Sequence, residues 1–108
     1  MNSKRKGKVG ELEWAEYLRN HGFEARRGQQ FSGGNDNPDV MSNIPNIHFE
    51  VKRVESLNVD KAMKQAVNDA GDKIPVVAHR KNNQDWLITM PAEAFLQYVE
   101  LANYNKVL

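Results

Sequence analysis

The chain is 108 residues long, carries a formal net charge of +1 and contains no cysteine. This length suits a single domain with one modest core, spanning residues 1–108, so any functional site must be built on one scaffold. The lack of cysteine excludes disulfides, thiolate catalysis and cysteine zinc sites. No segment approaches the roughly 18 apolar residues of a membrane span, and the first residues are polar and basic. We therefore expect a cytoplasmic protein that has no membrane contact.

Positive charge is concentrated at the N-terminus, where residues 1–8 form a basic tail ahead of the first acidic residue. The cluster consists of Lys4, Arg5, Lys6 and Lys8. Such a cluster suits binding to phosphate groups, and a solvated tail is the alternative interpretation. The overall charge says little about partners, so the distribution of the basic residues is the more informative signal.

The residues from Val9 to Asn20 are strong helix formers, and Gly22 just beyond them is a plausible stop. The apolar stripe expected to be buried consists of Val9, Leu12, Trp14, Ala15 and Leu18. Glu11 shares this face, because Trp14, Ala15 and Leu18 follow it at i+3, i+4 and i+7. Glu13 and Glu16 are expected to face water. A carboxylate on an apolar face is costly without a partner, so Glu11 has either a functional role or a salt bridge to an arginine.

A first strand is predicted from Phe23 to Arg27, ending in the basic pair Arg26 and Arg27. The loop that follows, residues 28–37, is rich in glycine, glutamine and asparagine. Ser32 and its glycine neighbours allow close approach of the backbone to a phosphate, whereas a merely flexible loop is the competing interpretation.

The segment from Pro38 to Lys52 carries the strongest functional signal. Side chains alternate along a strand, so His48, Glu50 and Lys52 share one face while the apolar residues between them face the core. Turn-forming residues between the two halves of the segment predict a hairpin that brings Asp39 beside Glu50.

Two adjacent carboxylates are costly unless a cation neutralises them, and oxygen ligands suit Mg²⁺ or Mn²⁺. Lys52 on the same face can then position or polarise a water beside the metal. The alternative is an ordinary half-solvated strand in which Glu50 and Lys52 form cross-strand ion pairs.

The second half of the chain predicts a helix, two strands and a final helix. Val59, Ala62, Met63, Ala66, Val67 and Ala70 form the stripe of the first of these helices, between the caps Asn58 and Gly71. Gln65 flanks this stripe and is a possible accessory residue. Strands are expected at Ile74–His79 and Trp86–Met90, and a helix from Pro91 to about Asn103. The last helix has a wide apolar surface formed by Phe95, Leu96, Tyr98, Val99 and Leu101.

The predicted order of helix, three strands, helix, two strands and helix resembles the PD-(D/E)xK nuclease superfamily, especially the archaeal-type and phage Holliday junction resolvases. The resemblance covers nearly the whole chain. Lys6, Gly7 and Glu11 match the Lys-Gly-x-x-x-Glu signature of those resolvases, Arg27, Ser32 and Gly33 match an arginine and a serine-glycine loop, and Asp39, Glu50 and Lys52 match the Asp and Glu-x-Lys motif. The glycine-asparagine loop is longer here and contains an additional acid, Asp36, which is an alternative ligand to Asp39.

The resemblance implies an α/β fold with a restriction-endonuclease-like αβββαββα core, in which helices flank a mixed five-stranded sheet. It also implies a Mg²⁺-dependent (or Mn²⁺-dependent) DNA endonuclease. Glu11, Asp39 and Glu50 would hold one or two metal ions, and Lys52 would orient the attacking water. The basic N-terminus, together with Arg26, Arg27, Arg53 and Arg80, would hold the DNA backbone without reading bases.

The substrate implied by the resemblance is a four-way DNA junction, in a prokaryotic or phage-infected cell. A homodimer would supply the two symmetric cuts, with the self-association surface on the last strand and helix. Two other classes remain open from the sequence. One is a related nuclease such as a nickase, a flap or branch nuclease or a restriction-like enzyme. The other is a non-catalytic DNA-binding protein whose acids form ordinary ion pairs.

Overall fold

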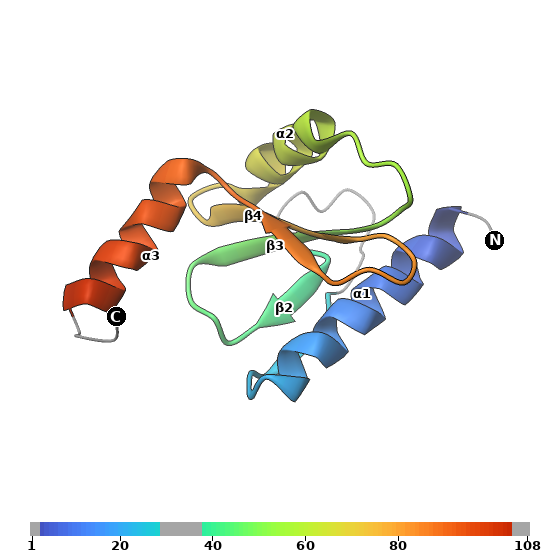
Figure 1. The fold of residues 1–108 in the computed structure, drawn as a ribbon, viewed down its shortest axis with the longest axis horizontal. Helices are drawn as coiled ribbons and strands as arrows, with labels where there is room; N and C mark the ends of the chain where they lie inside the picture. The colour runs from blue at the N-terminus through green and yellow to red at the C-terminus, as the bar shows by residue number, and fades with distance from the viewer. Residues whose placement is uncertain (1–2, 29–37, 105–108) are drawn as a thin grey trace.

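The computed structural model describes residues 3–28 and 38–104, and the side chains of residues 7–28 and 38–103. Its elements are α1 (Ser3–Asn20), β1 (Ala25–Arg27), β2 (Val40–Ser42), β3 (Ile47–Arg53), α2 (Val59–Ala70), β4 (Ile74–Arg80), β5 (Leu87–Thr89) and α3 (Ala92–Tyr104) (Figure 1). This order confirms the predicted αβββαββα arrangement. The helix expected from Val9 begins earlier, at Ser3, and so includes most of the basic tail.

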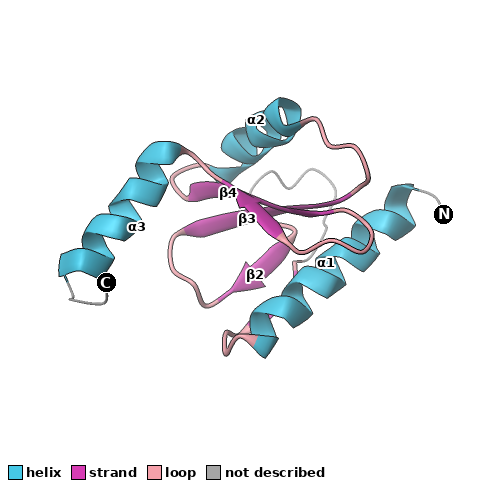
Figure 2. Ribbon diagram, viewed as in Figure 1, coloured by secondary structure: helices cyan, strands magenta, loops and turns pink. Residues whose placement is uncertain are grey.

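The five strands form one mixed sheet in the order β1-β2-β3-β4-β5. β3 and β4 are parallel, whereas the other neighbouring pairs are antiparallel. Helix α2 makes the crossover between the two parallel strands and covers one face of the sheet, while α1 covers the other (Figure 2). The central strand β3 therefore has a helix over each of its faces.

Helix α1 packs on the sheet through Trp14, Ala15 and Leu18, as the sequence predicted. Its aromatic anchor Trp14 meets Phe49 of β3 edge-on, with ring centroids 5.5 Å apart. The expectation that Val9 and Leu12 are also buried is wrong, because both are exposed. The line of α1 that lies on the sheet runs through Gly10, Glu11 and Trp14 instead, and Val9 and Leu12 fall outside it.

Helix α2 begins and ends as predicted. The Asn58 side chain accepts a hydrogen bond from the Lys61 backbone N–H at 3.0 Å, and Gly71 adopts a positive φ of 59° at the C-terminus. The buried face consists of Ala62, Ala66 and Ala70. The expectation that Val59 and Val67 belong to it is wrong, because both are exposed. A face made of alanines lets the helix backbone lie close to the sheet.

Helix α3 stands away from the sheet (Figure 1). Ala94 is buried, but Phe95, Leu96 and Leu101 are 56%, 56% and 57% exposed. Most of the apolar surface of this helix therefore does not pack on the core. In the part of the chain with described placement, no helix is long and apolar enough to cross a membrane.

Gly10 allows α1 to approach β3 closely. A Cβ atom at this position would lie 2.7 Å from Cβ of Arg53, which is closer than such atoms pack. Gly7, in the same helix, would meet nothing within 4 Å.

We predict that Gly10→Ala lowers the free energy of unfolding by about 1–3 kcal/mol, the typical cost of overpacking, because α1 must shift on the sheet. Gly7→Ala is the control, and it should raise stability by up to about 1 kcal/mol, because alanine favours the helix. Urea unfolding monitored by circular dichroism measures both. Equal stability of the two variants would show that α1 is not held against Arg53.

Candidate active site

Asp39 is fixed to β3 by its backbone and its side chain. Its backbone N–H donates to the Phe49 carbonyl at 2.9 Å, and its Oδ2 accepts from the Val51 N–H at 2.8 Å. On the other side its carbonyl accepts from the Gly28 N–H at 2.8 Å. The pairing of Val40 with Phe49 confirms the predicted hairpin. Asp39 directly precedes Val40 and contacts β3 through its side chain.

Glu50 is buried, with 3% of its surface exposed, on the face of β3 that α2 covers. Burial raises the pKa of its carboxyl group, a hydrogen bond from His48 opposes the rise, and the neighbouring charge and hydrogen bond of Asp39 add to it. The buried carboxyl group of Glu50 therefore interacts with the half-buried carboxyl group of Asp39. A divalent cation would relieve this repulsion, and the metal-binding role of Asp39 and Glu50 stays a prediction.

Glu11 is buried, and the charges of Asp39 and Lys52 act on its carboxyl group. Its Oε1 accepts a hydrogen bond from Arg27 Nε at 2.6 Å, the arginine salt bridge left open by the sequence. Burial raises the pKa of Glu11, the Arg27 hydrogen bond lowers it, and the charges of Asp39 and Lys52 act in opposite directions. The helical-face argument thus placed Glu11 correctly on the buried face, where the charges of Asp39 and Lys52 act on it.

Lys52 faces α2, and its Nζ donates to Gln65 Oε1 at 3.1 Å. The accessory residue proposed from the sequence therefore holds the lysine. The alternative of a half-solvated strand is wrong, because β3 is buried on both faces from His48 to Val51.

The sequence did not single out Asp69 of α2. One oxygen of this residue lies within 4.8 Å of a ring nitrogen of His48 and a carboxylate oxygen of Glu50. Asp69 follows Gln65 by one helical turn, so the two side chains share a face of α2. With Gln65 placed opposite Lys52, this spacing could have indicated Asp69 as a further residue near β3.

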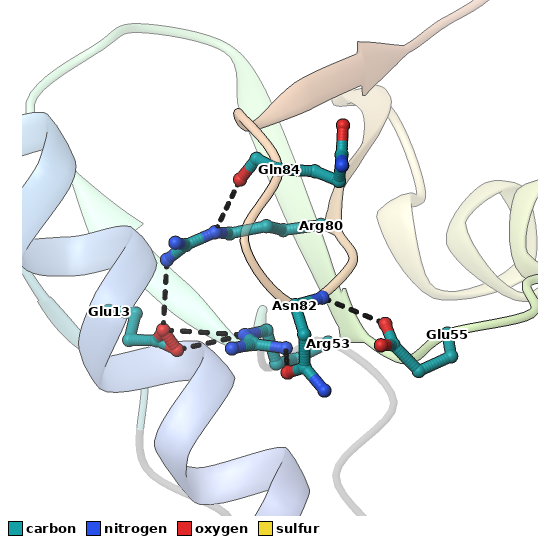
Figure 3. Close-up of polar contacts among 6 residues, drawn as sticks. All are labelled: Glu13, Arg53, Glu55, Arg80, Asn82 and Gln84. Atoms are coloured by element: carbon teal, nitrogen blue, oxygen red, sulfur yellow. Dashed lines mark hydrogen bonds and ion pairs between the residues drawn. The ribbon is translucent and has the colours of Figure 1, made fainter.

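Arg53 and Arg80 share a single acid on α1 (Figure 3). Glu13 accepts from Arg53 Nε at 3.0 Å and from Arg80 Nη1 at 3.2 Å, which contradicts the expectation that Glu13 faces water. Further hydrogen bonds tie this group to the β4–β5 turn: Arg53 to the Asn82 side chain, Arg80 to the Gln84 carbonyl at 2.7 Å, and the Asn82 N–H to Glu55 at 2.8 Å. This ion cluster lies on the α1 face of β3, opposite Lys52.

The other residues predicted to contact DNA differ in exposure and in whether the structure describes their side chains. Lys8 and Arg26 are exposed. Lys4, Arg5 and Lys6 belong to α1, but their side chains lie outside the described residues, as do Ser32 and Asp36. The DNA-binding roles of these residues and of Arg27, Arg53 and Arg80 remain predictions.

Residues 2–105 match the family model of the archaeal Holliday junction resolvase (Hjc). The chain belongs to this family. The fold of the resolvase is similar to the 1.6 Å structure of Archaeoglobus fulgidus Hjc, a Holliday junction resolvase from an archaeal hyperthermophile. The match has a TM-score of 0.57 and 24% identity and covers 79% of this chain and 72% of that chain. No curated protein sequence matches the resolvase significantly.

Family membership confirms the resemblance drawn from the Lys-Gly-x-x-x-Glu and Asp…Glu-x-Lys patterns. The resolvase is a structure-specific endonuclease of the PD-(D/E)xK superfamily that acts on DNA junctions. The mixed sheet with β3 parallel to β4 agrees with the predicted restriction-endonuclease-like core.

The raised pKa of Glu50 predicts how stability depends on pH without metal. The fold favours the protonated form of Glu50, so the contribution of this group to folding stability is fully present below its unfolded pKa, near 4.5. The contribution is lost as pH rises through the higher folded pKa. Glu50→Gln should remove this part of the loss of stability with rising pH. Thermal unfolding of both proteins between about pH 4 and pH 8, in chelator, measures it. Parallel curves for the two proteins would contradict the assignment.

Proposed function

We propose that Asp39 and Glu50, assisted by Glu11, bind a divalent cation, Mg²⁺ or Mn²⁺, and that Lys52 orients the attacking water. The observation that carries the proposal is the buried carboxyl group of Glu50 in direct interaction with Asp39. When both groups are ionised, such a pair destabilises a folded protein unless a cation occupies the site. The oxygen-only donor set suits hard divalent cations.

Each of these side chains is held by a neighbour. The Val51 N–H fixes one oxygen of Asp39. Arg27 keeps Glu11 in place, and Gln65 holds the ammonium group of Lys52. When bound, the divalent cation stabilises charge on the scissile phosphate and on the leaving oxygen. Lys52 then donates a hydrogen bond to the water that attacks the phosphorus, while its positive charge attracts the phosphate.

Contacts to the DNA backbone come from basic residues around this centre. The exposed side chains of Lys8 and Arg26 are available for phosphates directly. Arg53 and Arg80 are bound to Glu13, so a phosphate near them must compete with that carboxylate. Backbone contacts of this kind position the substrate without reading its sequence, as a junction-specific enzyme requires.

Cleavage of a synthetic four-way junction tests the proposed centre. Asp39→Asn should lower the Mg²⁺-dependent rate by more than about 100-fold, the upper range for residues that only support metal ligands. Junction binding at fixed salt should persist or strengthen, because a negative charge beside the phosphates is removed. Asp72→Asn, in the exposed turn after α2, is the control and should cut normally. Full activity of Asp39→Asn would remove the metal assignment, and equal cleavage of junction and linear duplex would remove the junction preference.

We also propose that the resolvase is a homodimer formed through β5 and α3. Two symmetric cuts in one junction call for two active sites, which a two-fold dimer presents at once. Leu87 and Ile88 of the edge strand β5 and Phe95 and Leu96 of α3 are exposed apolar residues. An apolar surface of this kind is unfavourable in water and suits association.

Analytical ultracentrifugation at micromolar concentration should give about twice the chain mass of 12.3 kDa. Phe95→Glu should shift the protein to the monomer, because burying an unpaired carboxylate in the interface is costly. Val67→Glu is the matched control, since Val67 on α2 is also 56% exposed. A monomeric parent protein, or the same loss of association in both variants, would rule out this interface.

A further inference from the structure

We infer that His48, supported by Asp69, is a positioning residue that fixes the carboxylate of Glu50 and thereby sets the affinity of the centre for its divalent cation. This inference rests on the proposed metal-binding role of Glu50. It assigns a function to a buried polar group that the proposed reaction does not otherwise use.

His48 is one of the most deeply buried large side chains of the described residues, with 1% of its surface exposed. It precedes Glu50 by two positions on β3, so both side chains point towards α2. His48 Nε2 lies 3.0 Å from Glu50 Oε1. An ionised carboxylate only accepts hydrogen bonds, so the imidazole donates when Glu50 acts as a ligand.

This hydrogen bond restricts how the Glu50 carboxylate can rotate. Oε1 is held by the imidazole, and the group retains its second oxygen and its remaining lone pairs for a cation. Without the hydrogen bond, ordering the carboxylate on metal binding would cost additional conformational entropy. Groups that orient a ligand in this way typically change metal affinity by about 10–100-fold when removed.

Asp69 lies on the last turn of α2, close to His48 and Glu50. One of its oxygens is within 4.8 Å of the ligand atoms of both His48 and Glu50. A carboxylate beside an imidazole favours the ring orientation in which the ring N–H groups donate hydrogen bonds to nearby acceptors. Gln65, one turn earlier, holds Lys52, so the same face of α2 supports both chemical groups of the Glu-x-Lys motif.

The burial of this group argues against a purely structural role. Replacing buried polar pairs by apolar side chains of similar volume is often neutral or stabilising. The neighbouring hydrophobic cluster consists of Ala62, Ala66 and Val77, with Leu57 and Met63 packed against it. Three polar side chains between β3 and α2 are therefore an expensive way to pack the sheet.

Mn²⁺ titration of the full chain by calorimetry, without DNA, tests the inference. His48→Leu should weaken Mn²⁺ binding about 10–100-fold with unchanged stoichiometry, while its melting temperature without metal stays equal or rises. His48→Gln, whose amide also donates a hydrogen bond, should retain most of the affinity. Junction cleavage by His48→Leu should fall at low Mn²⁺ and recover as Mn²⁺ is raised.

Asp69→Asn provides a second variant, should His48→Leu not fold. It should weaken Mn²⁺ binding relative to Asp72→Asn, an exposed acid on the turn after α2. Parental affinity in the folded His48 and Asp69 variants would overturn the inference. So would loss of a whole equivalent of Mn²⁺ in His48→Leu, which would make His48 a ligand. If Asp39→Asn abolishes Mn²⁺ binding while the His48 and Asp69 variants do not weaken it, the proposed function stands and this inference alone fails.

Discussion

The burial of the Glu50 carboxyl group beside Asp39 is the constraint on which the rest of the site depends. It follows from topology: because β3 and β4 are parallel, their connection crosses over the sheet as α2 and covers the polar face of β3. The opposite face of β3 is already covered by Trp14, Ala15 and Leu18 of α1. A carboxylate at position 50 cannot therefore be solvated as on an ordinary surface strand, and it requires a hydrogen-bond donor, a cation or both.

Ion pairs fix the position of α1 relative to this buried acid. Glu11 is tied to β1 through Arg27, and Glu13 is tied to the ends of β3 and β4 through Arg53 and Arg80. Between these acids and the tail, Gly10 brings the helix backbone against Arg53. The helix that carries one predicted metal ligand is thus docked by contacts on both sides of that ligand. These partly buried pairs also mean that several arginines expected to meet DNA already have protein partners.

Much of the fold follows from local patterns in the sequence. The order of the elements, the Asn58 and Gly71 caps and the hairpin between Asp39 and Glu50 depend on periodicity, capping and turn chemistry, and all were predicted. Glu11 was placed correctly because helical spacing alone puts it on the face of Trp14 and Leu18. The family resemblance then connected these residues to a nuclease.

The errors concern partners that are distant in the sequence. Periodicity assigned Val9 and Leu12 to the core, but which line of α1 lies on the sheet depends on the close approach at Gly10. Glu13 was expected to face water because its partner Arg80 comes from another part of the chain. Asp69 was missed because its relation to Glu50 depends on the alignment of α2 over β3. Burial of both faces of β3 likewise follows from the crossover and not from the strand sequence.

Anomalous diffraction from crystals soaked in Mn²⁺ tests the central claim most directly, because it locates the cation independently of activity. The account predicts an anomalous peak at ligand distance from carboxylate oxygens of both Asp39 and Glu50, absent from crystals of Asp39→Asn soaked in the same way. A parent crystal with no peak between these two residues, at a Mn²⁺ concentration that supports junction cleavage, would contradict it.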